Sequence, residues 1–255
     1  MCDTCGCNDN KKEIKLLENI FKGNLKLANH NKEHINKLKA LSINLISSPG
    51  AGKTTLLENT IELLKDKLKI AVLEGDIETQ RDAERIRAKG IPAIQLTTGG
   101  ACHLEAELVH KGLSALEKLI KDFSWPTKNP LYPEDPLDLL FIENVGNLVC
   151  PASFYLGEDM RVVLTSVPEG PDKPAKYPKA FKTADVFIIT KIDLLPYFKD
   201  FDLQKIKEEA LSLNPNLEIF TISNETKEGF DQWIDYLMKR LAKKKSYLKN
   251  SKNQI

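Results

Sequence analysis

The chain has 255 residues, of which 42% are hydrophobic and 29% charged, proportions typical of a globular protein with one substantial core. Its 37 lysines and arginines nearly balance its 36 aspartates and glutamates, so the net charge is +1 and no overall field favours nucleic acid or a membrane surface. Residues 1–40 lack a secretory signal pattern, and no apolar run is long enough to cross a membrane, which predicts a cytoplasmic protein with no nucleic-acid or membrane partner.

Three of the five cysteines, Cys2, Cys5 and Cys7, lie on a polar tail with nothing apolar to bury them. In a cytoplasmic protein such spacing indicates metal or redox chemistry rather than structural disulfides. A C-x-x-C-x-C run with a glycine hinge brings three thiolates to one ion. Square-planar nickel or tetrahedral zinc would fit, with the terminal amine or a partner protein as fourth ligand. The alternative is a reduced, exposed tail.

Residues 11–40 are rich in lysine, glutamate and asparagine, and their apolar positions predict one or two amphipathic helices interrupted near Gly23. His30 and His34 lie four residues apart and would share a helical face, which permits a metal pair. We favour the alternative of two solvated histidines. This segment is expected to be a tether between the cysteine tail and a globular domain.

From residue 41 onward, short apolar runs alternate with helical patterns, which is typical of an α/β fold with a mainly parallel sheet and helices on both faces. Strands are expected over 42–47, 69–75, 93–97, 137–143, 160–166, 185–190 and 217–222. Helices are expected over 53–67, 79–89, 102–121, 178–183, 202–213 and 226–245. Such sheets bind ligands at the carboxyl ends of their strands, where the motifs below fall.

Residues 47–55, Ser-Ser-Pro-Gly-Ala-Gly-Lys-Thr-Thr, join the first of these strands to a helix as a phosphate-binding loop (P-loop) does. Ser47 replaces the usual first glycine. Lys53 is expected on the β and γ phosphates and Thr54 on Mg²⁺, while glycines let backbone N–H groups converge on phosphate oxygens. The loop residues expected to contact nucleotide are Gly50, Ala51, Gly52, Lys53, Thr54 and Thr55.

The sequence Thr190-Lys-Ile-Asp193 closes the expected strand 185–190 and indicates which base is bound. Asp193 would accept hydrogen bonds from the N1–H and 2-amino groups of guanine, which adenine lacks, so GTP is the expected nucleotide. Lys191 would lay its stem along the base, and Ser223 would add a base-side contact. Guanine motifs normally begin with asparagine. Thr190 lacks the amide that braces the loop, which predicts modest affinity.

Asp76 and Glu143 each end an expected strand and point toward the phosphates. Either would hold Mg²⁺ directly or through water, and Asp76 would also orient the attacking water. Gly146 is expected to read the γ-phosphate through its N–H. The alternative is that both acids cap the following loops. The candidate catalytic residues are Lys53, Thr54 and Asp76.

The remaining cysteines predict a second metal site in the same layer. Cys102 and His103 follow a glycine turn at the head of an expected helix, and Cys150 lies four residues beyond Gly146. Two thiols and an imidazole suit zinc or nickel, and the site would be shared if two subunits met there. The alternative is a pair of buried, inert cysteines.

In their order along the chain, these motifs resemble the HypB family of hydrogenase nickel-incorporation GTPases, which are SIMIBI-type P-loop NTPases. The resemblance covers about 41–241. It rests on the P-loop and on Gly-Asp-Ile-Glu-Thr-Gln-Arg-Asp at 75–82, Thr-Gly-Gly-Ala-Cys-His at 98–103, Glu-Asn-Val-Gly-Asn-Leu-Val-Cys at 143–150 and Thr-Lys-Ile-Asp at 190–193. Both cysteine sets also fall where that family, or some of its members, keeps metal sites.

The resemblance implies a metallochaperone with GTP or GDP, Mg²⁺, Ni²⁺ and Zn²⁺ as ligands. GTP binding would favour a homodimer and hydrolysis would reverse it. Nickel would pass toward the large-subunit precursor of a nickel-iron hydrogenase with the help of a HypA-type nickel accessory protein.

The domain prediction has three parts: a metal-binding tail and helical tether over 1–40, a P-loop GTPase domain over 41–245 and a polar C-terminal tail over 246–255. Three rival functions stay open. The sister GTPase that serves urease would not be expected to carry the cysteine tail. A P-loop small-molecule kinase would need an acceptor pocket but no Asp193, and a metal buffer would use the nucleotide domain only as a scaffold.

Overall fold

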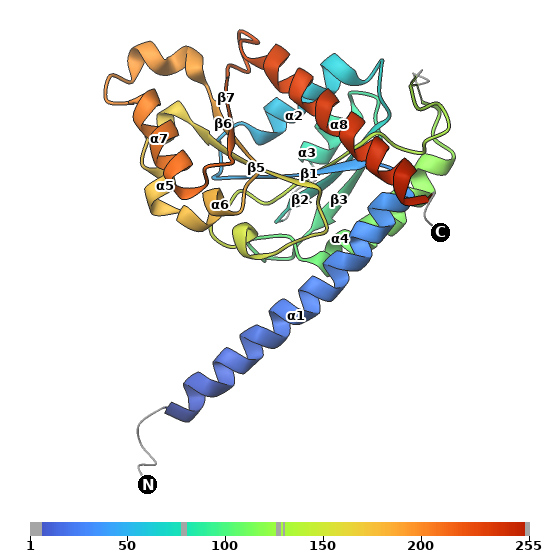
Figure 1. The fold of residues 1–255 in the computed structure, drawn as a ribbon, viewed down its shortest axis with the longest axis horizontal. Coiled ribbons are helices and arrows are strands. Elements are labelled where there is room, and N and C mark those ends of the chain that lie inside the picture. Colours follow the sequence, from blue (N-terminus) through green and yellow to red (C-terminus); the bar gives the residue numbers. More distant parts are fainter. Residues whose placement is uncertain (1–6, 78–80, 126–128, 130, 253–255) are drawn as a thin grey trace.

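The computed structural model describes residues 7–77, 81–125, 129 and 131–252, and within these the side chains from residue 19 to residue 250. Its centre is a seven-stranded sheet in the order β3-β2-β4-β1-β5-β6-β7, and every neighbouring pair of strands is parallel (Figure 1). The strands are β1 (Leu41–Ser47), β2 (Ile70–Asp76), β3 (Ala93–Thr97), β4 (Leu139–Glu143), β5 (Met160–Ser166), β6 (Val186–Thr190) and β7 (Glu218–Ile222). The predicted α/β fold is confirmed. The first and last residues of each strand lie within two positions of those expected.

Helices cover both faces of the sheet (Figure 1). One face carries α2 (Lys53–Leu64), α3 (Arg81–Arg87) and α8 (Phe230–Lys252). The other carries α1 (Cys7–Lys37), α4 (Ala106–Lys121), α5 (Lys173–Lys176), α6 (Pro178–Lys182) and α7 (Leu203–Leu213). Turns of 3₁₀ helix occupy Pro151–Ser153, Val167–Glu169 and Ile192–Tyr197. Of the helices that the structure describes, none is long and apolar enough to cross a membrane.

Two cores lie on opposite sides of the sheet because successive strand residues point to opposite faces. Ile43 is in register with Phe141 and Met160, and all three are buried beneath α2 and α8. Leu73 and Ile142 are in register on the other face and pack beneath α4. Burial on both faces explains why the strands read as nearly continuous apolar runs. The parallel arrangement brings the carboxyl ends of the strands to one edge.

Residues 7–37 form one continuous helix, so the predicted interruption at Gly23 is wrong. Gly23 is exposed, and a glycine in a helix costs only about 0.5–1 kcal/mol, which packing further along outweighs. Ala28 and Ile35 are fully buried, and the side-chain amide of Asn31 donates to the carbonyl oxygens of Ala106 (2.8 Å) and Leu156 (3.1 Å). The second half of α1 is therefore part of the globular body rather than a tether, while its first half extends away (Figure 1).

The helix predicted over 102–121 begins only at Ala106. Gly99 and Gly100 take positive φ angles of 62° and 104°, and the chain after them stays in loop conformation up to the start of α4. Cys102 and His103 consequently lie in a loop before the helix.

The helix predicted over 226–245 runs instead from Phe230 to Lys252. The predicted polar tail 246–255 thus begins inside α8. Lys245, toward the end of this helix, is 2% exposed, and its Nζ donates to Asp135 Oδ2 at 2.9 Å, so the helix is held against the body at this point.

We expect Gly157→Ala to loosen the docking of α1. Gly157 has a φ of 99°, and a Cβ there would lie 2.5 Å from the carbonyl oxygen of Ala28 and 2.8 Å from the amide nitrogen of Lys32. The free energy of unfolding, measured by chemical denaturation, should fall by about 1–3 kcal/mol. Gly23→Ala is the matched control, because a Cβ at this position meets nothing within 4 Å. This substitution should stabilise the helix by about 0.5–1 kcal/mol. Parent-like stability of Gly157→Ala would contradict the close approach.

Candidate functional site

The P-loop borders a pocket of ≈ 430 Å³ at the carboxyl edge of the sheet. Predicted nucleotide residues that line it are Gly50, Gly52, Lys53, Thr54, Thr55, Asp76, Glu143, Gly146 and Lys191. Gly50 and Gly52 take φ angles of 76° and 88°, a region that favours glycine, and α2 begins directly after Gly52. Lys53 is 8% exposed, and its Nζ donates to Ser47 Oγ at 3.0 Å. The serine at the usual glycine position thus holds the P-loop lysine in the pocket.

Two buried carboxyl groups lie side by side in this pocket. Glu74 of β2 and Glu143 of β4 face each other in the parallel register, and Thr54 Oγ1 donates to Glu143 Oε1 at 2.7 Å. Burial raises the pKa of Glu143, and burial together with the charge of Glu143 raises the pKa of Glu74 well above its usual range. Among the described residues, Oε2 of each has no hydrogen-bond partner. Buried oxygens with this need for positive charge fit a hard cation such as Mg²⁺.

The acids predicted for Mg²⁺ therefore come together, and one more joins them. Asp76 lines the pocket, and its Oδ1 accepts the N–H of Ile77 at 2.7 Å. Glu74 was not among the predicted site residues. The signal that identifies it is an acid inside the otherwise apolar run of the expected strand 69–75, since a buried carboxyl group in a strand needs a partner or a cation.

The loop after β6 is fastened to the P-loop by two hydrogen bonds. Thr190 Oγ1 donates to the carbonyl oxygen of Ala51 at 2.6 Å, and Lys191 Nζ donates to that of Gly50 at 2.8 Å. Thr190 is fully buried and supplies a brace through its hydroxyl group, in place of the asparagine amide that guanine motifs usually carry. Lys191 has a φ of 58°, which turns the chain toward Asp193.

Asp193 and Ser223 meet beside this loop. Ser223 Oγ donates to Asp193 Oδ1 at 2.6 Å and accepts the N–H of Thr226 at 3.0 Å. Asn224, not predicted as a site residue, lies next to the P-loop, where its side-chain nitrogen is 3.4 Å from the carbonyl oxygen of Gly52. The serine thus orients the carboxylate that is predicted to read guanine.

The Cys102, His103 and Cys150 side chains gather as predicted, with one potential ligand atom from each within 4.8 Å of the others. The two sulfurs are 2.9 Å apart, and Cys102 Sγ is 3.7 Å from His103 Nδ1. Burial lowers the pKa of His103, which favours the neutral, metal-binding form of its ring. The ring contacts that of Phe154 in a tilted arrangement, with a centroid separation of 4.1 Å and an interplanar angle of 33°. Two sulfurs and a nitrogen are the ligand set that zinc and nickel prefer.

The predicted tail site falls almost entirely beyond the part of the chain that the structure describes. Cys2 and Cys5 lie outside the described residues, and of Cys7 only the backbone is described, as the first residue of α1.

One segment, 143–150, runs from the phosphate pocket to the metal cluster and is hydrogen-bonded along its length. Asn144 Oδ1 accepts the N–H of Leu104, next to His103, at 3.0 Å. Asn147 Nδ2 donates to the carbonyl oxygen of Cys102 at 3.3 Å. Neither asparagine was predicted as a site residue, although both flank the proposed γ-phosphate sensor Gly146, which packs on Pro49 of the P-loop.

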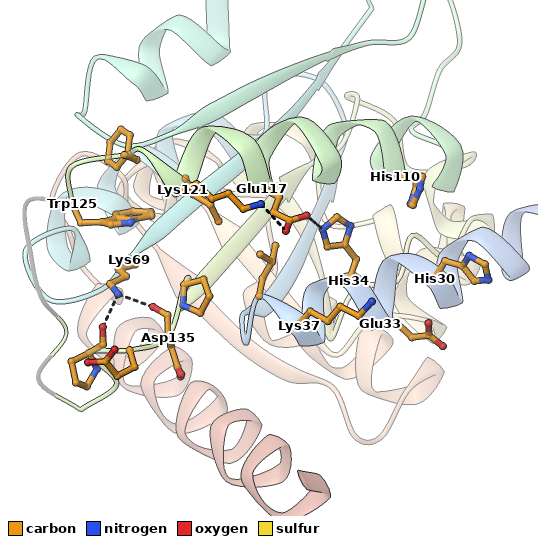
Figure 2. A pocket seen from close by; sticks show the side chains of 16 residues that line it. His30, Glu33, His34, Lys37, Lys69, His110, Glu117, Lys121, Trp125 and Asp135 are labelled. Atoms are coloured by element: carbon orange, nitrogen blue, oxygen red, sulfur yellow. Dashed lines mark hydrogen bonds and ion pairs between the residues drawn. The ribbon is translucent and has the colours of Figure 1, made fainter. Parts of the chain in front are cut away.

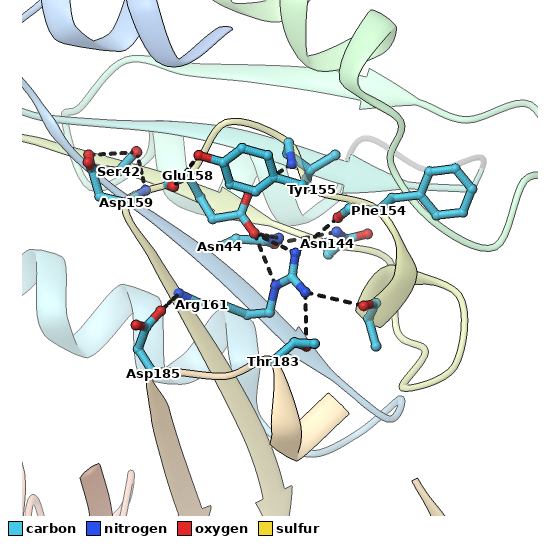
Figure 3. Close-up of polar contacts among 12 residues, drawn as sticks. Ser42, Asn44, Asn144, Phe154, Tyr155, Glu158, Asp159, Arg161, Thr183 and Asp185 are labelled. Carbon is cyan, nitrogen blue, oxygen red and sulfur yellow. Dashed lines mark hydrogen bonds and ion pairs between the residues drawn. The ribbon is translucent and has the colours of Figure 1, made fainter. Parts of the chain in front are cut away.

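A buried polar network also connects Asn144 of this segment to Phe154 (Figure 3). Asn144 Nδ2 lies 3.4 Å from Asn44 Oδ1, and Asn44 Nδ2 lies 3.3 Å from Glu158 Oε1. Arg161 pairs with Glu158 at 2.7 Å and donates to the carbonyl oxygen of Phe154 at 3.1 Å. The Phe154 ring contacts the His103 ring. Asn144, the residue that follows Glu143, is therefore connected to the cluster on both the Cys102 side and the His103 side.

Comparison with known proteins gives a consistent result. Residues 41–221 match the family described as CobW/HypB/UreG, nucleotide-binding domain. The chain is 46% identical over 218 residues to the hydrogenase maturation factor HypB of Escherichia coli K12, covering 86% of this chain and 69% of that relative. It is 43% identical to the hydrogenase/urease maturation factor HypB of Helicobacter hepaticus, covering 92% and 91%.

A solved structure, HypB from Helicobacter pylori in complex with nickel, superposes with a TM-score of 0.76 at 40% identity. The superposition covers 87% of this chain and 96% of that one. The arrangement of the sheet and helices is therefore shared with a nickel-bound protein.

We expect Glu74→Gln to change how stability depends on pH. Because the native state raises the pKa of Glu74 above its ordinary value of 4.5, it holds this proton more tightly than the unfolded chain does. The nucleotide-free parent should thus lose stability as the pH rises from 4.5 through the raised pKa, and glutamine removes that loss. At pH 8 the variant should be more stable than the parent in thermal or denaturant unfolding, with little difference at pH 4.

The control is Glu84→Gln, which replaces an exposed glutamate of α3. It should leave the pH dependence of unfolding unchanged. A stability difference between Glu74→Gln and the parent that is the same at pH 4 and pH 8 would contradict the raised pKa.

Proposed function

This chain belongs to the CobW/HypB/UreG family of nucleotide-binding domains, and on that premise we propose that it is a GTP-hydrolysing metallochaperone. It would bind nickel, and zinc at the same cluster, and deliver nickel to the large-subunit precursor of a nickel-iron hydrogenase. Two similarities support this proposal: a relative 46% identical is named a hydrogenase maturation factor, and a solved relative holds nickel.

The observation that carries the proposal is the physical connection between pocket and cluster. Glu143 and Cys150, the two ends of segment 143–150, contact Thr54 and Cys102 respectively, and Asn147 joins the segment to the Cys102 loop. A change at the γ-phosphate position therefore reaches both sulfurs through a few hydrogen bonds. Separate nucleotide and metal functions would not need this arrangement.

Hydrolysis is assigned to the residues of the pocket. Lys53 would exchange its contact with Ser47 for oxygens of the β and γ phosphates, and Asp76 would orient the attacking water. Thr54, Glu143 and Glu74 would hold Mg²⁺, which supplies the positive charge that lets both glutamates ionise. Gly146 would donate its N–H to the γ-phosphate. Asp193, oriented by Ser223, would select guanine.

Nickel would be the cargo of this protein rather than a resident cofactor. Cys102, His103 and Cys150 supply three ligands from one chain and leave a coordination position for another group. Cys102 is exposed, and the neighbouring Val149 is an apolar side chain that is 58% exposed. A second copy of the chain would cover this face and share the ion, which gives the GTP-dependent homodimer. The Cys2, Cys5 and Cys7 tail would exchange nickel with a HypA-type accessory protein.

The client enzyme has a second candidate. One relative, 43% identical over most of both chains, is named a hydrogenase/urease maturation factor, so urease maturation is an alternative or additional role. Activation of a hydrogenase or urease precursor by the purified, nickel-loaded protein separates the two.

The base preference tests the nucleotide assignment. With Asp193 paired to donors that only guanine offers, GTP should bind more tightly than ATP, by up to about 10⁴-fold if the contact is fully dry. Asp193→Asn should move the preference toward xanthosine nucleotides, whose ring carries an acceptor where guanine has a donor. Binding is measured by calorimetric titration in Mg²⁺.

Lys53→Ala serves as the control for this experiment, because it removes charge from the phosphates and should weaken GTP and xanthosine triphosphate alike. Equal affinity of the parent for ATP and GTP would reject guanine recognition by Asp193.

The coupling between nucleotide and metal tests the function as a whole. In a Cys2→Ser, Cys5→Ser, Cys7→Ser background, nickel and zinc dissociation constants should differ between GDP and a non-hydrolysable GTP analogue by about 5- to 150-fold. Reciprocity requires the metal to change the ratio of GTP to GDP affinity by the same factor. Asn147→Ala, which keeps all three ligands, should shrink the difference. Identical constants with an unchanged oligomeric state would leave the cluster a structural site.

A further inference from the structure

Three of the four histidines of the chain line a separate cavity of ≈ 720 Å³ between α1 and α4 (Figure 2). Two of them have a partner at a ring nitrogen. His34 Nε2 lies 3.0 Å from Glu117 Oε2, and His110 Nδ1 lies 3.1 Å from Asn31 Oδ1. The fourth histidine, His103 of the metal cluster, differs from these two. Its Nε2 is buried and has no hydrogen-bond partner among the described residues.

The two ring nitrogens of His103 have different surroundings. Nδ1 lies 3.7 Å from Cys102 Sγ, whereas Nε2 is covered by protein atoms. A nitrogen and a sulfur that bind one ion at about 2.1 Å and 2.3 Å are about 3.1–3.6 Å apart for angles between 90° and 109°. Nδ1 is therefore the ring nitrogen that is placed to share an ion with Cys102. In such a neutral ring Nε2 carries the hydrogen, and a buried N–H without an acceptor is costly.

Neighbouring aromatic rings restrict the imidazole. The Phe154 ring contacts the His103 ring at a centroid separation of 4.1 Å, and Phe21 of α1 contacts Phe154 at 5.3 Å. Because these contacts hold the His103 ring in place, an acceptor for its Nε2–H has to move to the ring.

The carboxylate of Glu105 is within reach of this nitrogen. Glu105 Oε1 lies 3.8 Å from His103 Nε2, and the Glu105 side chain is 52% exposed. Glu105 is the residue that precedes α4, but its side chain makes no cap hydrogen bond to the helix. The backbone N–H groups on either side of it, those of Leu104 and Ala106, are hydrogen-bonded to asparagine side chains. A movement of about 1 Å by this exposed side chain, with the backbone in place, gives an ordinary hydrogen-bond distance.

We propose that Glu105 is a positioning residue for His103, and that its carboxylate accepts the Nε2–H of the imidazole when Nδ1 binds Ni²⁺ or Zn²⁺. Metal-binding histidines typically donate their other N–H to a carboxylate or carbonyl group, which fixes the ring and makes the ligand nitrogen more basic. The inference rests on the metal binding proposed above for the Cys102, His103 and Cys150 cluster. It adds the residue that determines which ring nitrogen is the ligand.

No cation in the described part of the chain competes for this carboxylate. The ion-pair contact of Glu105 there is with His103, whereas Glu107, two residues further on, pairs with Lys111 at 2.7 Å. The two glutamates are therefore near each other at the start of α4 but have different partners.

The test uses the full chain in the Cys2→Ser, Cys5→Ser, Cys7→Ser background, with Zn²⁺ as the probe. Competition with a chromophoric chelator measures the Zn²⁺ dissociation constant. Glu105→Ala should weaken binding by about 10- to 100-fold. Glu105→Gln keeps an acceptor oxygen without the charge, so it should recover part of this loss.

Nuclear magnetic resonance of ¹⁵N-labelled histidines identifies the ligand atom. In the Zn²⁺-loaded parent, the long-range ¹H–¹⁵N pattern of His103 should show hydrogen on Nε2 and metal on Nδ1, and the spectrum of His103→Gln provides the assignment. The Nε2–H proton resonance should move upfield in Glu105→Ala, because hydrogen-bonded protons resonate downfield. A role of Glu105 in the stability of α4 alone would not cause this shift.

Glu107→Ala is the matched control, because it removes an exposed carboxylate from the first turn of the same helix. It should leave both the dissociation constant and the His103 spectrum unchanged. Metal on Nε2, or parent-like affinity of Glu105→Ala, would overturn the role of Glu105 and leave the cluster a metal site. Absence of bound Zn²⁺ from the parent would overturn the metal site proposed above and this inference with it.

Discussion

The pocket beside the P-loop depends on two carboxyl groups that lie next to each other at the same edge of a parallel sheet. The register of β2 and β4 puts Glu74 beside Glu143, and burial raises the pKa of both. Two acids cannot both ionise in such a place without positive charge, so one keeps its proton unless a cation such as the proposed Mg²⁺ joins Lys53 in the pocket. Strand pairing therefore places both carboxyl groups in the pocket beside the P-loop.

Between the pocket and the metal cluster, the connections are polar. Asn144, Asn147 and Arg161 bind backbone carbonyl or amide groups of the loops that hold Cys102, His103 and Phe154. Apolar contacts tolerate small displacements, whereas hydrogen bonds depend on direction, and breaking the buried one between the Leu104 N–H and Asn144 would leave costly unpaired atoms. Such a network would suit the coupling that we propose between the phosphate site and the metal cluster.

α1 is attached to the body by side-chain amides that bind backbone groups. Asn24 donates to the carbonyl oxygen of Tyr155 and accepts the N–H of Ala106, and Asn31 donates to Ala106 and Leu156. The contact to Asn24 pairs the N–H of Ala106, one of the amides at the start of α4 that have no partner within the helix. Asn31 Oδ1 also lies 3.1 Å from His110 Nδ1, so one buried residue joins α1 to α4 through both its amide nitrogen and its amide oxygen.

By itself the sequence determined the features that depend on neighbouring residues. The strands were predicted from apolar runs, and the P-loop from glycines that one contiguous turn requires. The Cys102, His103 and Cys150 group followed from the expectation that strand ends meet at one edge. Only the tertiary structure decided the partners of Glu74, Asn144 and His34, because no pattern in the sequence marks which residue, 40 to 83 positions away, each of them contacts. The continuity of α1 through Gly23 was likewise decided by tertiary packing, which outweighs the local cost of a glycine.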